Sequence, residues 1–110
     1  MSSKLLVIIA SGDKEKALAG MMYARNVIKY GWLDNVKVVF FGPSEKLVAD
    51  DAEVGNKAKE IAAMTKCFAC KAISEPDGVS ENLAEIGIEV DYIGDVISNL
   101  IKEDYAPVVW

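Results

Sequence analysis

The sequence contains no histidine, and this absence excludes most of the acid–base and metal chemistry that proteins carry out near neutral pH. It has only two cysteines, Cys67 and Cys70, so one chain cannot supply the four ligands of a structural zinc site. We therefore expect no metal and no cofactor. A thiol becomes the main candidate for chemistry, because a thiolate attacks sulfur without needing a general base.

Dense positive charge and long apolar segments are also missing. The chain has 12 basic and 17 acidic residues, a net charge of −5, and no Lys/Arg run that would neutralise a row of phosphates. The apolar run at residues 5–10 is too short to span a membrane, and no signal-peptide cleavage site follows it. We expect a cytoplasmic protein that binds neither nucleic acid nor membrane.

The length of the chain predicts one domain. Residues 1–110 are enough for a single core without disulfide or metal support. Hydrophobic residues make up 52% of the chain, which is high for a small monomer because such a protein has little interior in which to bury them. The excess predicts a buried subunit interface, and hence a homo-oligomer.

Apolar runs alternate with helical patterns along the chain. Expected strands cover residues 5–10, 36–41, 66–70, 88–93 and 107–110. Expected helices cover residues 14–30, 46–48, 53–64, 81–86 and 96–102, the fourth of them capped by Ser80. Pro76 and Gly78 predict a loop at residues 75–78. This alternation predicts a three-layer α/β/α sandwich with a mainly parallel five-stranded sheet and a flavodoxin-like appearance.

Right-handed crossovers place every strand-to-helix turn at the carboxyl edge of such a sheet, where ligands bind. Three turns are expected there: residues 11–13, residues 42–44 and the turn after Cys70. Ser11 and Gly12 in the first turn are candidates to support an anion. Pro43 and Ser44 in the second turn are further candidates. Capping of the following helix is the commoner role for residues of these types.

Cys70 is expected to end the third strand and to face the start of the next helical turn. Helical N–H groups and the charge of Lys71 would favour its thiolate form. Cys67, a second thiol, lies inside the strand and is expected to point to the opposite face, which disfavours a disulfide with Cys70. The residues alone leave two roles open for Cys70: a reactive thiol, or the small buried apolar residue that free cysteine most often is.

The order of these segments resembles that of the DsrE/DsrF-like family over nearly the full length. The resemblance is carried by residues 4–13, residues 36–44, Cys70 with residues 78–80 and Leu83, and residues 87–90, 94–97 and 104–108. It implies an α/β/α fold, homo-oligomers such as trimers or hexamers, and a sulfur-relay, TusD-like role. It also implies that Cys70 carries sulfur as a persulfide between a donor protein and an acceptor protein.

The resulting prediction is a small cytoplasmic persulfide carrier, a possible sulfurtransferase, that acts through Cys70. Two alternatives stay open. One is a non-catalytic oligomeric module that binds a small anion or a partner protein at the same sheet edge. The other is a redox switch formed by Cys67 and Cys70.

Overall fold

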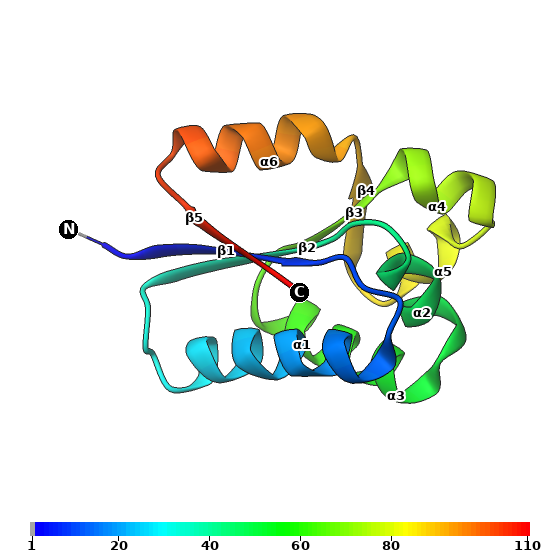
Figure 1. Ribbon diagram of the computed structural model, residues 1–110, viewed down its shortest axis with the longest axis horizontal. Helices are drawn as coiled ribbons and strands as arrows, with labels where there is room; N and C mark the ends of the chain where they lie inside the picture. The colour runs from blue at the N-terminus through cyan, green and yellow to red at the C-terminus, as the bar shows by residue number, and fades with distance from the viewer. Residues whose placement is uncertain (1) are drawn as a thin grey trace.

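The computed structural model describes residues 2–110, in which strands and helices alternate (Figure 1). The strands are β1 (Lys4–Ile9), β2 (Asn35–Phe40), β3 (Cys67–Cys70), β4 (Ile88–Asp91) and β5 (Ala106–Val109). The helices are α1 (Lys14–Lys29), α2 (Ser44–Asp50), α3 (Ala52–Met64), α4 (Lys71–Asp77), α5 (Ser80–Glu85) and α6 (Ile93–Lys102). Every expected strand is present, with bounds that differ from the prediction by one or two residues.

The strands form one sheet in the order β4-β3-β2-β1-β5, and every neighbouring pair is parallel. The predicted three-layer sandwich is confirmed, with a sheet that is fully parallel instead of mainly parallel. The likeness to flavodoxin lies in the layers, because the flavodoxin strand order is 2-1-3-4-5. Figure 1 shows α1 and α3 on one face of the sheet and α6 on the other. This division follows from right-handed crossovers, since α6 returns the chain from β4 to β5 across the sheet.

The larger core lies between the sheet and the pair α1 and α3. Helix α1 begins where the Asp13 carboxylate accepts a hydrogen bond of 3.1 Å from the Lys16 N–H. The strands contribute Leu5, Val7, Ile9, Val36, Val38 and Phe40 to this core, and the helices contribute Ala17, Met21, Ala24, Val27, Val54, Ala58 and Ile61. These side chains are almost completely buried, so this face holds most of the apolar area removed from water.

The core on the α6 face is thinner. Its buried members are Leu6, Val39, Phe68, Cys70, Ile93 and Leu100. A single helix covers this face, and all four residues of the edge strand β5 are exposed. Apolar side chains therefore remain at the surface here, among them Val109 and Ile101.

The segment after Cys70 is helical, so the prediction of a loop at residues 75–78 is wrong. Helix α4 includes Pro76 and ends at Gly78, whose φ of 71° is left-handed. Proline removes only one helical hydrogen bond here, because the helix is a short one that stops just after it. The cap predicted at Ser80 is also wrong: α5 has no side-chain cap, and the Ser80 hydroxyl lies 2.7 Å from that of Ser74.

Candidate functional site

Two of the predicted turns touch at the carboxyl edge of the sheet. Figure 1 shows α2, α4 and α5 gathered at this edge, away from the N-terminus of the chain. A Cβ atom on Gly12 would lie 2.8 Å from the Cβ of Pro43, so the first turn packs directly on the second. Glycine is required at position 12 by this close approach.

The serines of these two turns, Ser11 and Ser44, already form hydrogen bonds with backbone groups of the fold. The Ser11 N–H donates to the Trp110 carbonyl over 3.2 Å. The Ser44 hydroxyl donates to the Ile9 carbonyl over 2.5 Å, and the Ser44 N–H donates to the Ala10 carbonyl over 3.2 Å. These contacts fasten the ends of β1, β2 and β5 to one another. Ser11 and Ser44, two of the residues that we expected to support an anion, thus have hydrogen-bond partners within the fold.

Cys70 lies at the predicted place, as the last residue of β3 and the residue that precedes α4. Its side chain packs on the α6 face beside Phe68 and Ile93, and 8% of the residue is exposed. Helix α4 has no side-chain cap, so no side chain satisfies the N–H groups of its first turn. The thiol therefore lies just below the surface, next to the start of a helix.

The ammonium group of Lys71 contacts other side chains. Its Nζ lies 3.6 Å from Oε1 of Glu75 and 5.6 Å from the centre of the Tyr92 ring. Both neighbours are exposed, so the pair is solvated and weak. Within residues 2–110, the contacts of the Lys71 ammonium group do not include Cys70. The predicted support of a Cys70 thiolate by Lys71 is therefore not seen.

Cys67 faces the core between the sheet and α1, on the opposite side of β3 from Cys70. It is only 1% exposed, and burial raises the pKa of its thiol to about 12, although Lys37 lowers it slightly. The two cysteines are three positions apart along the strand, so their Cα atoms lie roughly 10 Å apart. A disulfide needs a Cα–Cα distance of less than about 7 Å. Both cysteines are free, and the predicted opposition of their side chains is confirmed.

Glu45 on α2 is the residue of this edge that the sequence analysis missed. It is 0% exposed, and its Oε2 accepts a hydrogen bond of 3.1 Å from the Gly42 N–H. Its Oε1 is buried without a hydrogen-bond partner among residues 2–110. Burial raises the pKa of this carboxyl to about 7, and the N–H groups of Gly42 and Cys70 lower it while the charge of Asp77 raises it. The only signal in the sequence is an acidic residue two places after Pro43.

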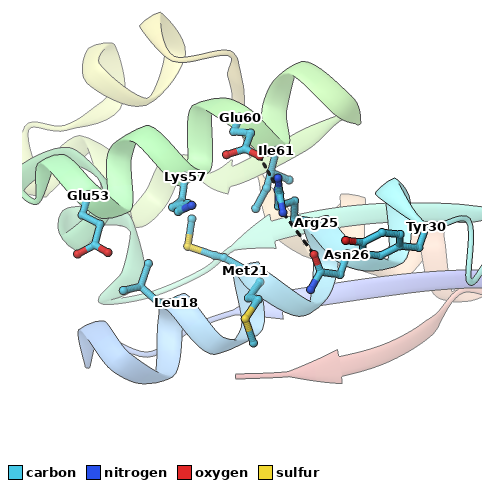
Figure 2. A pocket seen from close by; sticks show the side chains of 10 residues that line it. Leu18, Met21, Arg25, Asn26, Tyr30, Glu53, Lys57, Glu60 and Ile61 are labelled. Atoms are coloured by element: carbon cyan, nitrogen blue, oxygen red, sulfur yellow. Dashed lines mark hydrogen bonds and ion pairs between the residues drawn. The ribbon is translucent and has the colours of Figure 1, made fainter.

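A cavity of about 450 Å³ lies away from this edge, between α1 and α3. It is lined by Leu18, Met21, Met22, Arg25, Asn26, Tyr30, Glu53, Lys57, Glu60 and Ile61. Figure 2 shows Arg25 of α1 pointing toward Glu60 of α3, and their ion pair measures 2.5 Å. This pair lowers the pKa of Glu60. Neither Cys70 nor Glu45 lines this cavity, so it lies apart from the candidate site at the carboxyl edge of the sheet.

Nowhere in residues 2–110 do three or more His, Cys, Asp or Glu side chains gather as a metal site would require. None of the helices in these residues combines the length and the apolar character needed to cross a membrane.

Two solved structures are similar to this chain over almost its whole length. A conserved protein of unknown function from Bacteroides thetaiotaomicron has a TM-score of 0.85 and 26% identity, and the match covers 97% of this chain and 95% of that one. A protein of unknown function from Methanobacterium thermoautotrophicum has a TM-score of 0.79 and 18% identity, with 98% and 99% covered. No protein-family model and no curated protein matches. These comparisons support the fold and name no function.

Proposed function

We propose that this protein is a small persulfide carrier of the DsrE/DsrF type, which accepts sulfane sulfur on Cys70 and passes it to a partner protein. The position of Cys70 is the observation that supports the proposal most. It ends a central strand of a parallel sheet and precedes an uncapped helix, at the edge where ligands bind in such folds. Cys67 is buried on the other face, which leaves a single thiol for the reaction.

The transfer needs no group that the chain lacks. The Cys70 thiolate attacks the outer sulfur of a donor persulfide, a new S–S bond forms on Cys70, and the donor S–S bond breaks. The donor leaves as a thiolate, which takes a proton from water. An acceptor thiolate then attacks the outer sulfur on Cys70 in the same way and releases the Cys70 thiolate. The transferred sulfur keeps its oxidation state, so neither an oxidant nor a reductant is consumed.

Access to the Cys70 sulfur requires a small movement of the protein, because the side chain is almost buried. Helix α4 is the element best suited to move. It is short, it contains Pro76, and it is bounded by Cys70 at one end and by the left-handed Gly78 at the other. Such segments open at low free-energy cost compared with the core of a domain.

We also propose a cytoplasmic homo-oligomer, a trimer or hexamer, that assembles through the side of the molecule formed by α6 and β5. The exposed apolar side chains of Ile101 and Val109 support this proposal. The edge strand β5 adds unpaired backbone groups on the same side.

Persulfide formation tests the function directly. The reduced protein is incubated with thiosulfate, polysulfide or a small-molecule persulfide, and its intact mass is measured. We expect a gain of one sulfur atom that is lost in Cys70→Ala and kept in Cys67→Ala.

The other outcomes of this experiment separate the alternatives. A protein that gains no sulfur from any donor would contradict the relay, and would favour a non-catalytic binding module at the same edge. A loss of two protons that requires both cysteines would indicate the redox switch. The structure disfavours that switch, because the two thiols lie on opposite faces of β3.

A further inference from the structure

Glu45 is a fully buried carboxyl group that the proposed sulfur transfer does not use. One of its oxygens accepts the Gly42 N–H, and the other has no hydrogen-bond partner within residues 2–110. A carboxylate in such a place is strongly disfavoured, because it loses its water and gains no cation in return. The described residues supply no salt-bridge partner, so the site favours the neutral acid.

The carboxyl group of Glu45 lies where two neighbouring strands end. Gly42 follows β2, and its N–H donates to the carboxyl over 3.1 Å. The N–H of Cys70, at the end of β3, also acts on the carboxyl and favours its charged form. Helix α2, which carries Glu45, packs on α4, which starts immediately after Cys70. Glu45 therefore lies beside the backbone that positions the Cys70 thiol.

The charged and titratable groups around Glu45 come from the elements that pack on α2. Asp77 of α4 is the charged side chain that acts on Glu45, and it opposes ionisation of the carboxyl. The thiol of Cys70 is the titratable group contributed by β3. Helices α3 and α5 also pack on α2, and none of their described side chains affects the Glu45 carboxyl. Ionisation would thus create a buried negative charge that is repelled by the charge of the exposed Asp77.

We propose that Glu45 is the positioning residue for Cys70: its neutral carboxyl holds the junction of β3 and α4 closed, and its ionisation opens that junction and makes the thiol reactive. The opening follows from the need of the new charge for water, which reaches the carboxyl only if α2 and α4 separate. The inference deepens the proposed function, on which it rests for the role of Cys70. It gives a chain without histidine a group that changes charge near neutral pH.

Alkylation of Cys70 tests the proposal without any sulfur donor. The Cys67→Ala protein has Cys70 as its only thiol, and its rate of reaction with iodoacetamide is followed from about pH 5.5 to about pH 8.5, a range centred near neutrality. Titration of the thiol alone raises the rate at most tenfold per pH unit, since only the thiolate reacts. We expect a steeper rise near neutral pH, which Glu45→Gln removes while the slope due to the thiol remains.

Asp77→Asn is a second variant, which changes the ionisation of the Glu45 carboxyl without altering Glu45 itself. Asp77 is exposed, so the substitution leaves the core intact. Removal of its charge makes ionisation of Glu45 easier, so the steep part of the profile should move to lower pH.

Two results would overturn the inference. One is a pH profile that stays steep near neutral pH in Glu45→Gln, or whose steep part stays at the same pH in Asp77→Asn if the first variant does not fold. The other is a Cys70 that stays unreactive throughout the range. Since alkylation requires no persulfide chemistry, a protein that fails to carry sulfur can still show the steep profile, and the two proposals are tested separately.

Discussion

At the scale of single residues, the two thiols of β3 differ because strand residues three places apart point to opposite faces. Cys67 belongs to the thick core under α1 and α3, while Cys70 belongs to the thin layer under α6. Burial holds the pKa of the Cys67 thiol at about 12, so the thiolate form is almost absent near neutral pH.

This difference predicts selective modification of the two cysteines. In the native protein at pH 8, iodoacetamide should label Cys70 and leave Cys67 unlabelled, because Cys67 is neither exposed nor ionised. Peptide mass spectrometry measures the labelling at each site. In urea both cysteines should react, which serves as the control, and equal labelling rates in the native protein would contradict the prediction.

Glu45 predicts a loss of stability as the pH rises. Its pKa is about 7 in the folded protein and near the ordinary 4.5 in the unfolded chain, so the folded state binds more protons between these values. The free energy of unfolding should therefore fall from about pH 4.5 to about pH 7, by on the order of 2 to 3 kcal/mol. Urea denaturation at pH 4.5 and at pH 8 measures this change.

Glu45→Gln should remove this contribution, because the amide stays neutral at every pH. The variant should match the wild type at pH 4.5 and be the more stable protein at pH 8. Equal pH dependence in the two proteins would show that Glu45 ionises without cost in the fold.

The sequence predicts the place of Cys70 and not the importance of Glu45. A strand end is visible in the sequence as the point where an apolar run stops, and this fixes Cys70 at the carboxyl edge. Burial of Glu45 depends on how α2 packs against α3, α4 and α5. The spacing of residues in the sequence does not predict that packing. An acidic residue near the start of a helix is usually solvated.

At the scale of elements, hydrophobic period and turn residues predict the strands and the longer helices, because these elements follow local rules. They fail at α4, where Pro76 indicates a loop. The segment is held as a helix by contacts with other elements, such as the pair of hydroxyls from Ser74 and Ser80 and the packing of α4 on α2. Short elements around the site therefore depend more on tertiary packing than long ones do.

Helices α1 and α6 predict opposite outcomes for two glycine substitutions. In Gly20→Ala the new Cβ would lie 2.6 Å from Ile9 Cδ1 and 2.7 Å from Trp110 Cγ. The crowding costs about 1–3 kcal/mol, which exceeds the gain of about 1 kcal/mol from helix propensity, so the variant should be destabilised. Gly94 of α6 has open space around it, so Gly94→Ala should stabilise the protein by up to about 1 kcal/mol.

Thermal unfolding of the two variants measures these effects side by side. The melting temperature should fall in Gly20→Ala and rise in Gly94→Ala. A rise in both would mean that Trp110 moves away from α1 without loss.

At the scale of the whole molecule, the two faces of the sheet are covered unequally. Two helices protect one face, whereas α6 alone protects the other and leaves β5 exposed along its length. Val109 is 62% exposed on this side, and Ile101 of α6 is exposed as well. A second copy of the chain would bury these side chains, in accord with the apolar excess of the sequence.

This asymmetry predicts which surface substitution changes the oligomeric state. Val109→Glu should give a smaller particle in light scattering, because a charge at the interface is costly to bury. Met22→Glu is the matched control: Met22 is 61% exposed, on the α1 side, and its substitution should leave the particle size unchanged. A wild-type protein that is monomeric at micromolar concentration would refute the proposed assembly.

The pairing of β1 with β5 also bears on the order in which the chain folds. Leu5 pairs with Ala106, and Trp110 donates its N–H to the Ile8 carbonyl over 2.8 Å, so this seam joins segments about one hundred residues apart. Closing so long a loop delays contact formation, whereas β1 and β2 meet after a single helix. We therefore expect the sheet to grow first from β1 toward β4. Docking of β5 would then be a late event, and until it occurs the free edge of β1 would be open to pairing with other chains.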